Sequence, residues 1–252
     1  MVRFRLLGCL EAERNEESLP LGGSQQQAVL AQLLLDRNRT LSISRLIDGL
    51  WAEDPPETAA HCLRVYVSNL RRILYGGRGE TLATYGSGYV LWADPGDVDI
   101  CVFQRLVQLG LTALEAGDAA SASDLLQRGL DLWRGPVLDG LRDEPFAAPH
   151  VAHFEELLMT AREHRIGADM MLGEHARLVG ELTELVMTHP LRETLWRHLM
   201  VALSGCGRPA EALAAYNQIH DLLRTEMGIE PSPQLKSLKA DIIRHGVCSP
   251  TG

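Results

Sequence analysis

The chain has 252 residues, of which 46% are hydrophobic and 23% charged, the composition of an ordinary folded protein. This composition excludes a disordered chain, a collagen-like fibre and a disulfide-rich miniprotein. The formal net charge is -9, and taken over the whole chain this acidity argues against nucleic-acid binding.

The first residues predict a small β-structure followed by a helix. Val2–Ala12 alternates and then runs apolar, which indicates a strand, and a polar turn at Asn15–Ser18 leads to a short return strand over residues 18–21. Ser24 can cap a helix over Gln25–Leu35, because the apolar residues of that segment recur at helical spacing.

A second helix is predicted after a short connection. Arg39–Leu41 can form a short strand, and Ser42 or Ser44 can cap a helix over Arg45–Trp51. The stretch 53–57 contains two consecutive prolines, which remove amide donors and restrict their neighbours, so it cannot be the interior of a helix.

A third helix and a hairpin follow. The helix is predicted from residue 58 to about residue 75 and ends at Gly76-Gly77. Leu82–Thr84 and Tyr89–Trp92 form a hairpin around Gly86-Ser87-Gly88. Strands, three helices and a hairpin, in this order, are the plan of a winged helix-turn-helix, whose third helix enters the DNA major groove and whose hairpin is the wing. We expect this domain over residues 1–93.

The third helix has two distinct faces. At about 100° per residue, Leu63, Val67, Leu70 and Leu74 fall together as a core stripe. The opposite face, with its flanks, mixes cations, a hydroxyl, an amide and an apolar group, which are the chemistries that read base edges. Its residues are His61, Arg64, Val65, Ser68, Asn69, Arg72 and Tyr75.

The charge of this segment differs from the average of the chain. Thr58–Gly79 holds four arginines, including Arg78, and no acid. Residues 1–93 hold ten basic and ten acidic residues, whereas residues 94–252 hold 14 and 23, so the acidic excess lies entirely in the second part. Because phosphate contacts act over short distances in salt, the local basic stripe favours DNA binding over an ordinary solvated face.

The hairpin supplies glycines for a tight turn and hydroxyls for phosphate, but no Arg or Lys. Tyr89 can belong to the core instead of the DNA surface. After the hairpin, Asp94-Pro95-Gly96-Asp97 interrupts the chain, and the rest is predicted to be helical. Asp97 and Asp99 could suggest a metal site, but two carboxylates without further oxygen ligands bind cations poorly, so we expect Asp99 to cap a helix and expect no metal.

The helical part contains an internal repeat. Gly173 and Gly207 are 34 residues apart, which is the tetratricopeptide period. Trp196, Ala212 and Tyr216 fall where that repeat places its aromatic and small residues. The pattern predicts a stack of helix pairs over residues 94–252 that binds proteins, with a generic helical bundle as the alternative. The fold class is therefore mainly α with a small β component.

These motifs together resemble the Streptomyces antibiotic regulatory protein family. The resemblance covers nearly the whole chain. In the first part it rests on Phe4-Arg5-Leu6-Leu7-Gly8, Leu46-Ile47-Asp48-Gly49-Leu50-Trp51 and Leu63-Arg64-Val65-Tyr66-Val67-Ser68-Asn69-Leu70-Arg71-Arg72. In the second part it rests on Leu132-Trp133-Arg134-Gly135, His189-Pro190-Leu191-Arg192-Glu193 and Gly228-Ile229-Glu230-Pro231.

The resemblance implies an OmpR-type winged helix followed by a bacterial transcriptional activation domain. It implies an activator of a secondary-metabolite gene cluster that binds direct repeats in double-stranded promoter DNA, as a possible homodimer, and recruits RNA polymerase through contacts that include the sigma subunit. The residues it assigns to DNA contact in the recognition helix and the wing are His61, Arg64, Val65, Tyr66, Ser68, Asn69, Arg71, Arg72, Thr84 and Ser87.

Two other functional classes are weaker. The alternative to a DNA-binding activator is a tetratricopeptide-like interaction or sensory regulator with weak or no DNA binding. An enzyme has no support, since the chain has no H-E-x-x-H, G-x-S-x-G or phosphate-binding loop, and neither catalytic residues nor cofactors are expected. Five scattered cysteines and the lack of a long apolar run favour a cytoplasmic protein without membrane contact. The DNA-binding role that the resemblance implies would associate it with the nucleoid.

Overall fold

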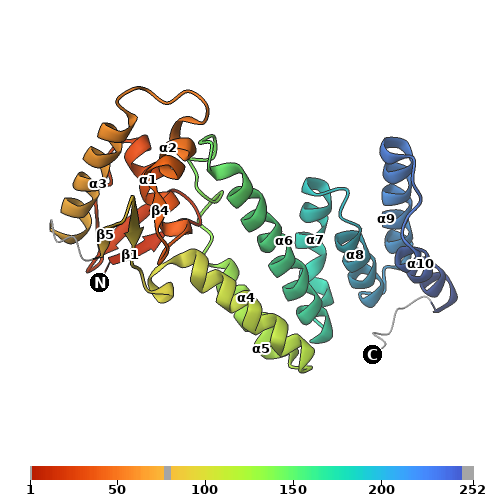
Figure 1. Cartoon of the computed structure of the whole chain (residues 1–252). Helices are drawn as coiled ribbons and strands as arrows, with labels where there is room; N and C mark the ends of the chain where they lie inside the picture. The colour runs from red at the N-terminus through yellow and green to blue at the C-terminus, as the bar shows by residue number, and fades with distance from the viewer. Residues whose placement is uncertain (1, 77–80, 246–252) are drawn as a thin grey trace. The chain divides into compact units, whose positions relative to one another are not determined.

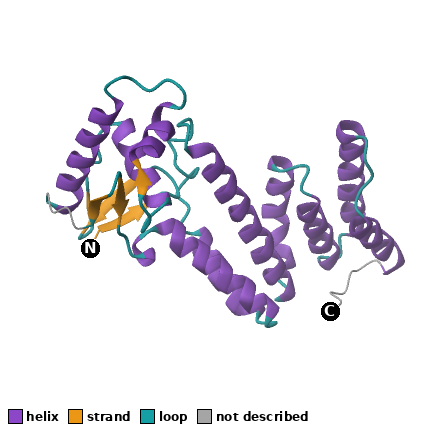
Figure 2. Ribbon diagram, in the orientation of Figure 1, coloured by secondary structure: helices purple, strands orange, loops and turns teal. Residues whose placement is uncertain are grey.

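The structure is a computed structural model, and it describes residues 2–76 and 81–245. Small sheets lie near the N-terminus and helices form the rest (Figures 1 and 2). The chain groups into two compact units. The first comprises the residues up to Gln108 with Arg128–Met159, and the second comprises Leu109–Gln127 with the residues from Thr160 onward. The first unit therefore contains the predicted winged helix together with Arg128–Met159 of the helical region, because residues in that segment form hydrogen bonds with the N-terminal strand region.

The N-terminal sheet has the order β1-β2-β3 and is antiparallel. Its strands are β1 (Val2–Arg5), β2 (Glu11–Arg14) and β3 (Glu17–Ser18). The prediction of one strand over Val2–Ala12 is wrong, because the chain reverses between residues 6 and 10. Gly8 has φ +142° there, and the buried Leu6 and Leu7 leave the sheet to enter the core.

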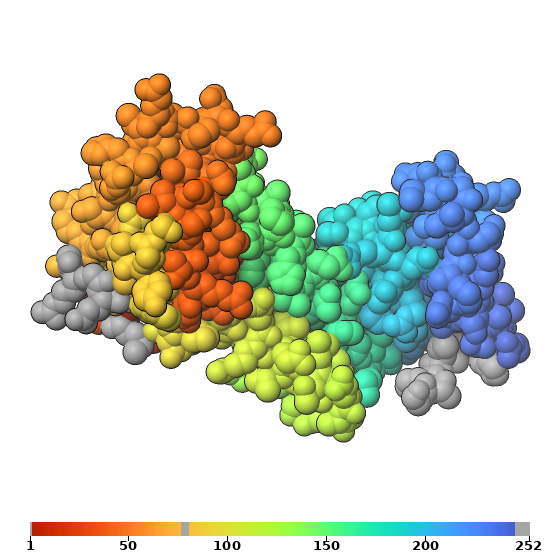
Figure 3. All heavy atoms as spheres, viewed as in Figure 1, coloured from red at the N-terminus to blue at the C-terminus, as the bar shows by residue number. Residues whose placement is uncertain are grey.

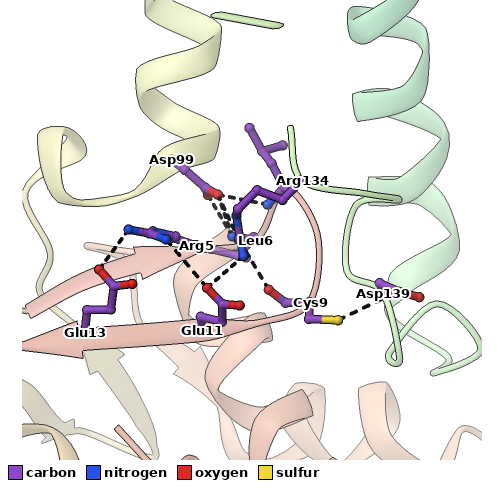
Figure 4. A network of polar contacts seen from close by, with 9 residues as sticks. Arg5, Leu6, Cys9, Glu11, Glu13, Asp99, Arg134 and Asp139 are labelled. Carbon is purple, nitrogen blue, oxygen red and sulfur yellow. Dashed lines mark hydrogen bonds and ion pairs between the residues drawn. The ribbon is translucent and has the colours of Figure 1, made fainter. Parts of the chain in front are cut away.

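A carboxylate from the helical region holds this reversal in place (Figure 4). Asp99 accepts hydrogen bonds from the backbone N–H of Leu6 at 2.8 Å and of Leu7 at 2.9 Å, and from that of Ile100 at 2.8 Å. Burial raises the pKa of Asp99, and these three amides oppose the rise. Asp99 is the first residue of its helix and not the expected cap, because within the helix its side chain accepts only from the adjacent Ile100 N–H. Its other two amide partners belong to the N-terminal strand region.

Arg134 completes the same network. Its guanidinium lies 2.7 Å from the Glu11 carboxylate and 3.8 Å from Asp99, and its backbone N–H donates to Leu7 O at 2.8 Å. Leu138 N–H likewise donates to Leu6 O at 2.9 Å. The Trp133-Arg134-Gly135 motif of the helical region is therefore a structural partner of the first strands.

The winged helix is built as predicted. Its second sheet has the order β4-β6-β5, and Tyr89 of β6 is buried opposite Leu41 of β4. A Cβ at Gly88 would overlap Leu41 O, so this position requires glycine. The elements are α1 (Ser24–Leu35), β4 (Leu41–Ser42), α2 (Ile43–Trp51), α3 (Ala59–Tyr75), β5 (Leu82–Tyr85) and β6 (Gly88–Leu91).

Two of the three helix ends predicted from the sequence in this domain are confirmed, and one is wrong. Ser42 caps α2, with its side chain accepting from Arg45 N–H at 3.1 Å. Gly76 ends α3 in the left-handed conformation with φ 65°. The prediction for Ser24 is wrong: Gly23 is the N-cap of α1 without a side-chain cap bond, and the Ser24 hydroxyl instead donates to Glu144 at 3.4 Å.

The remaining residues are almost entirely helical, as predicted. No helix within the described ranges is both long and apolar enough to cross a membrane. After a 3-10 turn, η1 (Pro95–Asp97), the elements are α4 (Asp99–Glu115), α5 (Ala119–Leu130), α6 (Ala147–Met171), α7 (His175–Thr188), α8 (Glu193–Gly205), α9 (Pro209–Leu222), a π-helical turn η2 (Leu223–Met227) and α10 (Pro233–His245).

The repeat predicted by the 34-residue spacing is present in the second unit. Gly173 and Gly207 both adopt positive φ, 83° and 73°, in the turns that follow α6 and α8. Trp196 of α8 and Tyr216 of α9 are buried, and Trp196 Nε1 donates to Pro190 O at 2.9 Å. This bond ties α8 to the proline that precedes it.

A buried polar cluster joins three helices of the second unit. Asp169 of α6 is 2% exposed and accepts from Arg165 at 2.7 Å, from Arg177 of α7 at 2.8 Å and from the Ser123 hydroxyl of α5 at 2.5 Å. Arg165 is also buried and pairs with Glu181 of α7. Two cations and two acids thus balance each other where α5, α6 and α7 meet.

Acidification is expected to destabilise the second unit through His198. Burial lowers the pKa of this α8 side chain to about 3, with the charges of Arg197 and His164 acting in the same direction. The folded state therefore binds fewer protons than the unfolded state between the ordinary pKa of about 6.5 and about 3, so stability falls as pH falls through this window. Between pH 7 and pH 5 the loss from this group is about 2 kcal/mol.

Urea denaturation at a series of pH values measures this effect. His198→Gln is expected to flatten the dependence of the unfolding free energy on pH below 6.5, whatever it does to stability at pH 8. His153→Gln, at an exposed histidine, serves as the control and keeps the full dependence. Equal slopes for His198→Gln and the unmodified chain would contradict the assignment.

Candidate nucleic-acid interface

Helix α3 separates the two predicted faces. Leu63, Val67, Leu70 and Leu74 are each 0% exposed, so the core stripe is confirmed. The atoms of α3, drawn orange, lie at the surface of the first unit (Figure 3). Five of the predicted contact residues are exposed along this helix: His61, Arg64, Val65, Ser68 and Arg72. Val65 is 42% exposed although it is aliphatic.

The cations of this face are not neutralised by acids. Within residues 2–76 and 81–245, neither Arg64 nor Arg72 forms a salt bridge. The fourth arginine of the basic stripe, Arg78, lies outside the described residues. Two guanidinium groups are therefore available on α3 for an external anion or base edge.

Three other predicted contact residues already have partners inside the protein. Tyr66 donates its hydroxyl to Gln25 Oε1 at 2.5 Å, and Asn69 Nδ2 donates to Gln26 Oε1 at 3.1 Å. Arg71 donates through Nε to Leu82 O at 2.7 Å. These three side chains connect α3 to α1 and to the wing, so their immediate effect is to orient α3.

The wing lies directly against α3. Arg71 Nη2 donates to Thr84 Oγ1 at 2.9 Å, and the Arg71 guanidinium lies over the Tyr89 ring, 5.8 Å from its centroid. Ser87 is exposed at the tip, and its carbonyl accepts from Ile43 N–H at 3.2 Å. Of the two predicted wing residues, Ser87 has an exposed side chain, whereas Thr84 accepts a hydrogen bond from Arg71.

Two residues that position α3 were missed by the sequence analysis. Arg14 of β2 donates through Nη2 to Ile73 O at 2.9 Å and also to Leu74 O, so a cation satisfies carbonyls at the C-terminal end of α3. Gln26 of α1 is 7% exposed and contacts Asn69. A sequence signal existed for Gln26: it lies three and four residues before Val29 and Leu30, on the apolar face of α1, where a buried amide needs a partner.

Comparison with known proteins agrees with this arrangement. Residues 17–91 match the family profile described as "Transcriptional regulatory protein, C terminal", and residues 98–243 match "Bacterial transcriptional activator domain". The regulatory protein DnrI of Streptomyces peucetius is 33% identical over 96% of this chain and 92% of its own length.

The chain belongs to the Streptomyces antibiotic regulatory protein family of transcriptional regulators. The regulatory protein AfsR of Streptomyces coelicolor is 41% identical over 96% of this chain, which spans only 24% of that longer protein. The fold is also shared with the solved structure of Mycobacterium tuberculosis EmbR in complex with a low-affinity phosphopeptide. That match has a TM-score of 0.93 and 36% identity, and it covers 96% of this chain and 65% of that one.

Membership of this family fixes the order of the functional parts. The OmpR-type winged helix contains α3 and the wing, and the activator domain contains the helices from α4 onward.

Proposed function

We propose that this chain activates transcription by binding direct repeats in promoter DNA through the exposed face of α3. The single observation that carries the proposal is this acid-free face, on which Arg64 and Arg72 have no acidic partner in the described part of the chain. In a winged helix the corresponding helix occupies the major groove. An arginine there can donate two hydrogen bonds to guanine, and Val65 can contact a thymine methyl group.

The wing has a smaller part in this proposal. Ser87 and Thr84 offer hydroxyl groups to phosphate, whereas Tyr85 stands at the tip, 67% exposed, in place of a cation. Phosphate contacts orient a protein on the duplex without specifying its sequence. We therefore assign the wing to backbone contact and α3 to sequence readout.

The second functional part, residues 94–252, is proposed to recruit RNA polymerase, including its sigma subunit, and to contact a second copy on adjacent repeats. Its acidic excess supports this division, because like charge keeps it away from DNA phosphates. Membership of the Streptomyces antibiotic regulatory protein family supports a target among secondary-metabolite genes. The alternative, an interaction or sensory regulator, would share the helical part but would not read DNA.

Selection of DNA from a random duplex pool by the full chain tests the proposal. The expected result is enrichment of one motif that occurs twice in the same orientation, with footprints over both copies. A run-off assay with purified RNA polymerase should then give more transcript from a promoter carrying the repeat than from one carrying a scrambled repeat. Failure to enrich any motif would favour the interaction-module alternative.

A further inference from the structure

A series of hydrogen bonds runs from the backbone carbonyl of Leu21, before α1, to the side chain of Arg72 on α3. Gln26 Nε2 donates to Leu21 O at 2.8 Å, and Asn69 Nδ2 donates to Gln26 Oε1 at 3.1 Å. Arg72 Nη2 then donates to Asn69 Oδ1 at 3.5 Å, the longest of the three bonds. The middle member, Gln26, is 7% exposed and lies on no surface that DNA could reach.

The bond to Leu21 O determines which group is the donor and which the acceptor in the two bonds that follow. The Leu21 carbonyl can only accept a hydrogen bond, so Gln26 must present its NH₂ group to Leu21 and its oxygen to α3. That oxygen in turn can only accept, so Asn69 must present Nδ2 to Gln26 and Oδ1 to Arg72. One backbone carbonyl in front of α1 thereby fixes the orientation of both amides.

This orientation decides what Asn69 can do. Recognition of adenine by an asparagine requires both its NH₂ group and its oxygen at the base edge. Here Gln26 accepts from the NH₂ group and Arg72 donates to the oxygen, so one donor and one acceptor position of the Asn69 amide are used inside the protein. Asn69 is thus placed to hold Arg72.

The backbone before α1 is adapted to the same contact. Gly22 has φ +83°, and a Cβ at this position would lie 2.7 Å from Gln26 Nε2. A side chain here would both strain the backbone and displace the Gln26 amide. The neighbouring Gln27 makes a similar bond, Nε2 to Gly22 O at 2.8 Å, but no described contact joins it to α3.

We propose that Gln26 is a positioning residue for DNA recognition, which acts through Asn69 to preset the guanidinium of Arg72 for its base pair. The inference rests on the proposed function, since it requires α3 to read DNA. It assigns specificity at that base pair to Arg72.

The test uses the full chain and two DNA probes: a duplex selected from a random pool by the unmodified chain, and a scrambled duplex of the same composition. Arg72→Ala is expected to weaken binding to the selected duplex roughly tenfold or more. Gln26→Met removes both amide contacts at similar side-chain volume, and it should weaken the same binding on the order of threefold to tenfold. Gln27→Met is the matched control and should leave it unchanged.

The double variant Gln26→Met/Arg72→Ala separates positioning from general stability. If Gln26 acts through Arg72, the double variant binds the selected duplex no more weakly than Arg72→Ala alone, and none of the glutamine variants changes binding to the scrambled duplex. Additive losses, or a Gln26→Met that behaves like Gln27→Met, would overturn the proposal. Should Gln26→Met not fold, Asn69→Ala takes its place, with the same expected absence of additivity with Arg72→Ala.

The same variants distinguish failure of the proposed function from failure of the positioning role alone. If Arg72→Ala leaves binding to the selected duplex unchanged, α3 does not read that DNA, and the assignment of the interface falls together with this inference. If Arg72→Ala weakens binding while Gln26→Met and Asn69→Ala do not, only the positioning role is wrong.

Discussion

Asp169→Ala is expected to lower the free energy of unfolding of the second unit by about 3–5 kcal/mol, the usual cost of removing one partner from a buried ion pair. Asp169 accepts three hydrogen bonds while only 2% exposed, and its nearest cation, Arg165, is almost as deeply buried. The variant leaves the buried Arg165 with Glu181 as its acidic partner, while the more exposed Arg177 keeps Glu174 at 3.9 Å. Among the described residues, Arg165 Nε already has no hydrogen-bond partner. The loss arises from uncompensated charge more than from lost attraction.

Urea denaturation followed by hydrogen exchange in α5, α6 and α7 measures this change, because exchange resolves the second unit from the first. Asp221→Ala is the control, since the Asp221 side chain is 78% exposed and its removal should change stability by no more than about 0.5 kcal/mol. The double variant Arg165→Met/Asp169→Ala should recover part of the loss, because it removes the buried cation as well. A loss below about 1 kcal/mol for Asp169→Ala would show that the cluster is not a main support of this unit.

Arg72→Ala is expected to cost about 1–3 kcal/mol of DNA-binding free energy. If Arg72 contacts a base, discrimination is lost at one base pair, and if it contacts a phosphate, affinity falls on all sequences and the slope of binding against salt decreases by about one charge. Fluorescence anisotropy at several salt concentrations, with the selected duplex and its single-base variants, distinguishes these results.

Two further arginine variants show whether the effect is specific to Arg72. Arg105→Ala removes the same charge from the exposed surface of α4 and should leave sequence discrimination intact. Arg71→Ala should instead loosen the wing, because Arg71 is bonded to Leu82 O and Thr84 Oγ1. Unchanged binding by Arg72→Ala at every salt concentration would contradict the placement of α3 in the DNA interface.

Local patterns were sufficient to predict most of the elements. The periodicity of α3, the proline pair before it and the glycines of the turns each act over a few residues, so the sequence alone carries them. The same holds for Ser42 as the cap of α2 and for Tyr89 as a core residue. The joint order of the family motifs identified the family, because it combines many independent short matches.

The candidate site was predicted less completely, since exposure and pairing depend on distant residues. Arg71 and Arg72 are adjacent and chemically identical in sequence, yet Arg71 is bonded to the wing and Arg72 is exposed. Asn69 matches a base-reading position by type, but its Nδ2 donates to Gln26, which lies 43 residues earlier in the chain. No pattern within α3 contains this information, because it arises only when α1 and β5 pack against the helix.

The sequence by itself determined the family, the helices and the acid-free basic stripe, because these depend on residue type and short spacing. The acidic average argues against nucleic-acid binding, whereas its division by region locates the acidic excess in the second part and the acid-free stripe in the first. The tertiary structure decided which stripe residues face solvent, how Asp99 ends the first strand, and which charges are buried around Asp169. These outcomes rest on hydrogen bonds between residues as many as 93 positions apart, whose geometry exists only in the folded chain.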